Sequence, residues 1–408
     1  MVKDICFYIN TPLEKRDYKR FGVELLLSRG FNVMFLDITR VFNPDYLANY
    51  RPSDLSDYQN VLVAENKDDI SDFLQSHKKH FGIDLIGAQK NNIFLYKLLK
   101  QLNIQYASFC ANSIPVVRNI DKFLRIIGYV KRNGFKGIYN KIINKLSALS
   151  IDFSDLQPPR YILAGGRKFI SKRPPPSKNT RIIWAHTLDY DLYLNLKQNK
   201  KQNSTKSESY CVFLDEYFPF HPDFLLQGLS VPVIDPVYYY GLLNKFFDYI
   251  EKYFEVPVII AAHPRSQYEA HPDYFRGRKI IKGNTIKLVA QSKFVLAHSS
   301  TSINFAVLFK KPIIFLMPGQ IKGGFYEESV SHFAKKLGKK PLNIKSVINI
   351  DIEKELLIDQ QAYTEYKENY IKRSGTPEKP FWEIVADRLI TDSLMKEDSL
   401  KKRYVLAP

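Results

Sequence analysis

A histidine and an arginine follow a buried strand in the second half of the chain, where they could act on a phosphorylated substrate. His263, Pro264 and Arg265 come directly after the apolar run 256–262. An imidazole can donate a hydrogen bond to a phosphate oxygen and can serve as an acid toward a leaving group, and an arginine adds positive charge. The alternative is a histidine that belongs to a structural turn.

A cluster of hydroxyls forms the second candidate group. Ser299, Ser300, Thr301 and Ser302 stand where the strand 293–297 gives way to an apolar helical segment. A helix N-terminus offers free N–H groups and a positive dipole end, so anions bind there. Ordinary N-capping is the alternative, but it needs only one such residue. The cluster therefore predicts a phosphate site.

Two adjacent acids, Asp215 and Glu216, follow the strand 211–214 in the same half of the chain. A carboxylate at the end of a strand can take the proton from an acceptor hydroxyl during group transfer. It can equally cap the turn that follows. Both interpretations stay open from the sequence.

An Asp-x-Asp pattern, Asp189-Tyr190-Asp191, has the form that some transferases use to hold a divalent metal. A match of three residues is weak, and acids at the N-terminus of a helix give the same pattern. We predict no metal and no cofactor.

The strands that position these groups are continuous apolar runs separated by helical segments. This pattern predicts parallel sheets covered on both faces, whose ligands bind beyond the carboxyl ends of the strands. We expect the strands 256–262 and 293–297 to be neighbours, which would bring His263 close to the hydroxyl cluster.

The first half of the chain also alternates strands and helices, so it predicts a second α/β domain. No G-x-G-x-x-G follows the first strand, 5–9, so a dinucleotide cofactor is not supported. Proline-rich patches within 157–179 are the best linker candidate. We expect an N-terminal acceptor-binding domain over 1–175, a C-terminal nucleotide-sugar domain over 176–385 and a helical tail over 386–408.

Net charge and cysteine content limit the expected partners and the expected cellular compartment. The net charge of +18 favours anionic partners, although lysines spread over every surface would produce the same total. The segment 118–150 is basic and amphipathic, which fits either an anionic membrane surface or helices that pack one face inward. Three distant cysteines fit no disulfide framework and no zinc spacing. No run is long enough to span a membrane. We expect a cytoplasmic protein, and peripheral contact with the inner membrane stays an open alternative.

His263-Pro264, Ser299-Ser300-Thr301 and the upstream Asp215-Glu216 together resemble the motifs of bacterial CMP-sugar transferases of the GT-B fold, over residues 205–320. These are the sialyltransferases and the related Kdo and nonulosonate transferases of capsule and lipopolysaccharide synthesis. The resemblance implies two Rossmann-type domains with a cleft between them. It also implies that Asp215 is the base, that His263 contacts the CMP phosphate and that the hydroxyls bind that phosphate. The family's acidic motif usually ends in glycine, whereas Tyr217 follows here.

The resemblance therefore predicts a glycosyltransferase that moves an acidic ulosonic sugar, a nonulosonate or Kdo, from a CMP donor to a capsule or lipopolysaccharide glycan. The expected partners are that donor, a glycan or glycolipid acceptor and the anionic inner membrane, and not nucleic acid. A CDP-glycerol-type polyol phosphotransferase of wall-polymer synthesis has similar motifs and is the first alternative. A non-catalytic polyanion-binding protein is the second.

Overall fold

The computed structural model describes residues 2–49, 52, 54–115, 153–199, 209–220, 234–319, 325–345 and 351–405. Within these residues the chain forms two compact units. The first holds residues up to 113, 153–191 and 371–405, and the second holds 192–370. The predicted basic segment, 118–150, lies outside the described residues.

The first unit is built on a parallel sheet whose strand order is β3-β2-β1-β4-β5-β6-β7. The strands are β1 (Asp4–Ile9), β2 (Asn32–Asp37), β3 (Val61–Val63), β4 (Phe81–Asp84), β5 (Tyr106–Phe109), β6 (Tyr161–Ala164) and β7 (Arg181–Trp184). The helices are α1 (Lys15–Arg20), α2 (Val23–Ser28), α3 (Thr39–Phe42), α4 (Pro44–Asn49), α5 (Lys67–Ser76), α6 (Ile93–Gln101) and α16 (Phe381–Val405). Helix α8 (Leu188–Asn199) begins in this unit and continues into the second.

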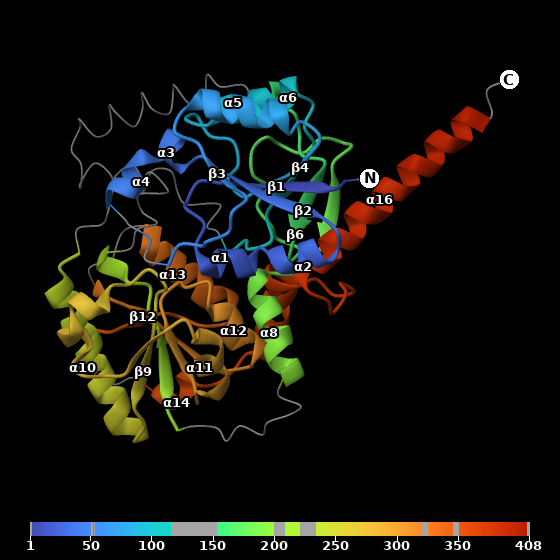
Figure 1. Cartoon of the computed structure of the whole chain (residues 1–408). Coiled ribbons are helices and arrows are strands. Elements are labelled where there is room, and N and C mark those ends of the chain that lie inside the picture. Colours follow the sequence, from blue (N-terminus) through green and yellow to red (C-terminus); the bar gives the residue numbers. More distant parts are fainter. Residues whose placement is uncertain are drawn as a thin grey trace. The chain divides into compact units, whose positions relative to one another are not determined.

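Both faces of this sheet are covered, which explains why its strands are apolar throughout. Along β1, Ile5 and Phe7 belong to one core cluster, whereas Cys6 and Tyr8 belong to another. Successive residues of a strand point to opposite faces, so a strand buried on both sides shows no alternation of apolar and polar residues. Helices α5 and α6 contact each other and lie side by side in Figure 1.

The second unit repeats this plan with strand order β10-β9-β8-β11-β12-β13, again parallel. The strands are β8 (Cys211–Leu214), β9 (Val258–Ala262), β10 (Ile280–Lys282), β11 (Val295–Ala297), β12 (Ile313–Met317) and β13 (Leu342–Asn343). The helices are α10 (Pro236–Phe254), α11 (Thr285–Gln291), α12 (Ile303–Leu308), α13 (Phe325–Lys336), α14 (Ile352–Glu355) and α15 (Gln360–Tyr366), with a π-helical turn over Lys367–Ile371. Short 3₁₀ turns over Phe218–Phe220, Tyr268–Ala270 and Pro272–Phe275 follow β8 and β9.

The domain boundaries differ from those predicted at 175 and 385. The strand predicted to begin the second domain is β7, which pairs with β6 and completes the first sheet. The C-terminal helix α16 also belongs to the first unit, where Trp382 donates its indole N–H to the carbonyl of Arg20 at 2.8 Å. Gly22 has a φ of 58°, and a Cβ there would lie 2.5 Å from the Trp382 ring. Only glycine meets both demands without strain.

Two parallel α/β units in one chain confirm the predicted GT-B-like fold class. The cleft between the units stays a prediction.

The three cysteines, Cys6, Cys110 and Cys211, are buried and form no disulfide. Among the described residues, no helix has both the length and the apolar character needed to cross a bilayer.

Candidate functional site

Asp215 lies at the carboxyl end of β8, in the middle of the second sheet, and both of its oxygens accept hydrogen bonds. Oδ1 accepts from the backbone N–H of Tyr217 at 2.9 Å. Oδ2 accepts from the Tyr268 hydroxyl at 2.8 Å and from the backbone N–H of His263 at 3.3 Å. The carboxyl is only 4% exposed. Asp215 therefore ties the loop after β8 to the loop after β9.

Glu216 reaches in the opposite direction along the edge of the sheet. Its Oε1 accepts from the backbone N–H of Ser299 at 2.6 Å, and its Oε2 accepts from the Ser299 hydroxyl at 3.4 Å. Ser299 follows β11, so Glu216 ties β8 to its other neighbour. Two of the donors predicted for a phosphate are thus held by the Glu216 carboxyl in this structure.

Burial shifts the proton equilibria of both acids in the same direction. Removal from water raises the pKa of the Asp215 carboxyl to about 6, against the lowering effect of its hydrogen-bond donors. Burial also raises the pKa of Glu216 to about 7, and the neighbouring Asp215 charge adds to the rise. Glu216 is half-buried rather than enclosed, so it can exchange a proton near neutral pH.

His263 follows β9, as predicted, and its ring has a defined orientation. Its Nδ1 accepts a hydrogen bond from the backbone N–H of Arg265 at 3.2 Å. When the ring is neutral, its proton therefore lies on Nε2, and this nitrogen can donate a hydrogen bond. His263 and Arg265 are half-buried and Pro264 is exposed, so this loop borders solvent.

The predicted adjacency of β9 and β11 is wrong, because β8 lies between them. Two strand spacings separate their ends, which is roughly 10 Å. His263 and the hydroxyl cluster still lie at the same edge of the sheet, one on each side of Asp215 and Glu216. The strand order could not be read from the sequence, since each of these strands is an apolar run of similar character.

The hydroxyl cluster adopts a tight turn before α12. Ser300 accepts the backbone N–H of Ser302 with its hydroxyl at 3.2 Å, and Thr301 is exposed. Ser302, the residue before the helix, makes no capping hydrogen bond with its side chain. Because α12 has only six residues, its dipole contributes little. Any anion here would be held by the turn's own N–H and hydroxyl groups.

Tyr217 occupies the position where the related motif carries glycine, and its backbone explains the preference. Its φ is 52°, in the left-handed region that glycine adopts freely. A non-glycine residue there costs about 1–2 kcal/mol. This left-handed residue directly follows Asp215 and Glu216, whose carboxylates bond to opposite neighbours.

Sequence reasoning missed the tyrosines that surround Asp215. Tyr268 donates to Asp215 and exchanges a hydrogen bond with the Tyr240 hydroxyl at 3.0 Å. No sequence signal marks them, since each is one of many aromatic residues.

The hydroxyl of Ser266, in the loop after β9, is buried without a hydrogen-bond partner. It is an additional polar group beside the predicted site.

The Asp-x-Asp pattern has a structural explanation. Asp189 and Asp191 lie in the first turn of α8. Asp191 accepts the backbone N–H of Phe381 at 2.8 Å, and Asp189 lies 3.8 Å from Arg20. Across the described part of the chain, no cluster of histidine, cysteine and acidic residues could hold a metal ion.

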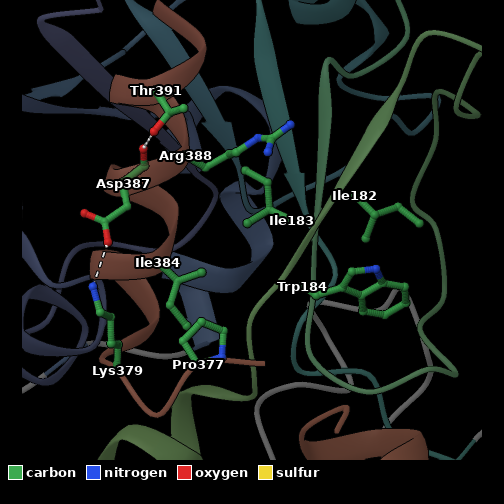
Figure 2. A pocket seen from close by; sticks show the side chains of 9 residues that line it. All are labelled: Ile182, Ile183, Trp184, Pro377, Lys379, Ile384, Asp387, Arg388 and Thr391. Carbon is green, nitrogen blue, oxygen red and sulfur yellow. Dashed lines mark hydrogen bonds and ion pairs between the residues drawn. The ribbon is translucent and has the colours of Figure 1, made fainter. Parts of the chain in front are cut away.

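A cavity of about 380 Å³ lies in the first unit, between β7 and α16, and contains none of the predicted site residues. Figure 2 shows its apolar wall, formed by Trp184, Ile182 and Ile384, and the charged residues Lys379 and Asp387 at its rim. Lys379 is paired with Asp387 at 3.0 Å. We therefore assign the candidate site to the polar edge of the second sheet and not to this cavity.

Comparisons with known proteins show similarity only in three dimensions. No protein-family model and no curated protein sequence matches the chain. Similar solved structures include UDP-GlcNAc 2-epimerase from Methanocaldococcus jannaschii, with 12% identity, 96% of this chain and 99% of that chain covered, and a TM-score of 0.46. They also include MurG from Acinetobacter baumannii, with 10% identity, coverages of 95% and 99%, and a TM-score of 0.44. The calicheamicin glycosyltransferase CalG4 has 10% identity, coverages of 90% and 95%, and a TM-score of 0.45. These values are too low to carry an argument about function.

Proposed function

We propose that this chain is a glycosyltransferase that moves an acidic ulosonic sugar from a CMP donor to a surface-glycan acceptor, with its donor site at the carboxyl edge of the second sheet. One observation carries the proposal. Asp215 and Glu216 are tied to the loops of His263 and Ser299 by hydrogen bonds between residues 48 and 83 positions apart in the chain. Acid, base and anion-binding groups thus meet where parallel sheets bind ligands.

Glu216 is the group best suited to accept the acceptor's proton. Asp215 is almost fully buried, whereas Glu216 is half-buried and has a pKa of about 7. A base works best when its pKa lies near the operating pH. We therefore assign Glu216 as the base, and Asp215 as the residue that positions the Tyr217 turn and the His263 loop.

His263 and the hydroxyls would hold the phosphate of the donor. As the acceptor oxygen bonds to the anomeric carbon, the bond from that carbon to the CMP phosphate breaks and the leaving phosphate gains charge. In the neutral tautomer the Nε2–H of His263 would donate to that oxygen. Ser299, Ser300 and Thr301 supply further donors, and Ser299 exchanges Glu216 for the phosphate when the donor arrives.

The choice of a CMP-ulosonate donor rests on the resemblance of these motifs to the CMP-sugar transferases. The net charge of +18 suits a donor that carries both a carboxylate and a phosphate. The first unit would hold the glycan acceptor, and the basic segment 118–145 would contact the anionic membrane.

The test is to incubate the protein with CMP-, CDP- and UDP-activated donors and to measure nucleotide release by chromatography. We expect CMP release from a CMP-ulosonate, and its loss in His263→Ala. Release of CMP from CDP-glycerol, with phosphate retained in the product, would identify a polyol phosphotransferase instead. Release from UDP-sugars alone would exclude a CMP-sugar transferase. Polyanion binding that is insensitive to His263→Ala, without any release, would indicate a non-catalytic protein.

A further inference from the structure

Four aromatic rings in the second unit, here called the stack, lie close together with nearly parallel planes, although their centroids do not form a single column. Tyr240 and Tyr274 have centroids 4.4 Å apart with planes inclined by 12°. Tyr274 and His271 are 4.8 Å apart at 16°. Phe220 lies 6.1 Å from both His271 and Tyr274, at 5° and 13°. Most aromatic contacts in a core are inclined or offset, so a run of parallel rings is a distinct feature.

The stack adjoins the proposed active site. Phe220 ends the 3₁₀ turn that begins three residues after Asp215, and His271 and Tyr274 follow the His263 loop. Tyr217 contacts Phe220 at 5.2 Å and Tyr268 at 5.2 Å between centroids. Tyr268 in turn donates to Asp215. The stack is therefore assembled from the loops after β8 and β9, the same loops that present the acid and the imidazole.

One end of the stack is buried and the other faces solvent. Tyr240 is 2% exposed, whereas Phe220 is 36% exposed and His271 is exposed. Phe218, in the same turn as Phe220, is 1% exposed and packs 4.5 Å from Tyr326. The core of this turn is thus filled by Phe218. Phe220 contributes less to burial, since 36% of its surface is exposed to solvent.

We infer that Phe220 and His271 form the platform on which the nucleobase of the bound nucleotide stacks. Every base has an aromatic face, and stacking on an exposed aromatic side chain tolerates any base. The platform therefore supplies affinity, and the identity of the base must be read by other groups. This inference rests on the proposed function for the place of the phosphate, but it does not depend on which base the donor carries.

The experiment measures dissociation constants of CMP, UMP and AMP for the full chain by isothermal titration calorimetry. We expect Phe220→Ala to weaken every nucleotide that binds by roughly 5- to 100-fold, the range that loss of one stacked aromatic ring produces. Phe220→Tyr keeps the ring and should restore the affinity. Tyr253→Ala is the matched control, because Tyr253 is a 50% exposed aromatic residue at the other end of α10 and should leave binding unchanged.

The platform and the proposed function can fail separately. If Ser300→Ala and His263→Ala weaken CMP while Phe220→Ala and His271→Ala do not, the nucleotide site stands and the platform is refuted. If UMP alone binds, and Phe220→Ala weakens it, the platform stands and the CMP donor is refuted. If Phe220→Ala and Tyr253→Ala weaken binding equally, or if no nucleotide binds the unmodified chain, the inference is overturned. Unchanged circular dichroism confirms that the variants fold.

Discussion

The two units share the strand order 3-2-1-4-5-6, to which the first unit adds a seventh strand, yet the acids at their sheet edges make different contacts. In the first unit Asp84, at the end of β4, accepts from the backbone N–H groups of Ile86 and Gly87, both at 2.9 Å. These donors lie two and three residues away, so Asp84 organises its own turn. In the second unit Asp215 and Glu216 bond across to the loops of two neighbouring strands. The strand order alone therefore does not make a site, and the second unit differs in having carboxylates that bond to the loops of both neighbouring strands.

The buried histidines of the two units, by contrast, have similar surroundings. His80 contacts the Tyr8 hydroxyl at 2.6 Å, and His298 contacts the Tyr239 hydroxyl at 2.9 Å. Burial lowers the pKa of both imidazoles to about 4, so both rings are neutral. These histidines are structural. His263 differs because it is half-buried and lies on a loop that borders solvent.

The largest expected effect is the difference in turnover between variants of Glu216 and of Asp84. Glu216→Gln should slow sugar transfer by about 10²–10⁴-fold, because the base is lost while its shape is kept. Asp84→Asn should leave the turnover number within a few-fold and instead lower the free energy of unfolding by about 1–3 kcal/mol. Initial rates and urea unfolding of both variants provide the measurement. Equal losses of turnover would show that the distinction between the units is wrong.

A glycine tests whether the first unit depends on its C-terminal helix. Gly22→Ala should lower the free energy of unfolding by about 2–4 kcal/mol, because it adds a Cβ at positive φ against the Trp382 ring. Gly241→Ala is the control in the second unit, since a Cβ there meets nothing within 4 Å. Urea denaturation measures both. An unchanged midpoint for Gly22→Ala would contradict the packing of α16 on the first unit.

Glu216 of the second unit should contribute to the pH dependence of stability. Above pH 4.5 the unfolded chain releases the Glu216 proton while the folded protein keeps it up to about pH 7. The unfolded state then binds fewer protons, so the free energy of unfolding falls as pH rises through this window. Glu216→Gln should remove about 2–3 kcal/mol of that fall.

Urea unfolding at pH 5 and pH 8 measures this slope. Glu269→Gln is the control. A hydrogen bond from its own backbone N–H lowers the pKa of this exposed carboxyl, so Glu269 does not contribute to the fall in stability. That variant should keep the fall seen in the unmodified protein. A slope that Glu216→Gln leaves unaltered would show that Glu216 already carries its charge when folded.

The smallest expected effect compares two matched tyrosines. Tyr268 donates to Asp215 and Tyr96 donates to Asp84, each at 2.8 Å. Replacing either by phenylalanine removes one hydrogen bond to a carboxylate and should cost about 1.5–3 kcal/mol of stability. Only Tyr268→Phe should also slow sugar transfer, because Asp215 positions the Tyr217 turn and the His263 loop. A loss of turnover in Tyr96→Phe would break the comparison.

The amino-acid sequence determined the fold class and the kinds of groups at the strand ends. Runs such as that of β9 are apolar over every residue, and a run of this kind must be buried on both faces wherever it lies. The polar residues that follow it must then lie at the carboxyl edge. For this reason Asp215, His263 and Ser299 were all predicted at the edge where the structure places them.

Only the tertiary structure decided which strands are neighbours and which partners the acids choose. The strands β8, β9 and β11 have similar apolar sequences, so their order depends on packing over the whole sheet. The same holds for β7 and α16, which join the first unit against the predicted boundaries. The contacts of Glu216 with Ser299 and of Tyr268 with Asp215 follow from that order, since they join residues that no local pattern connects.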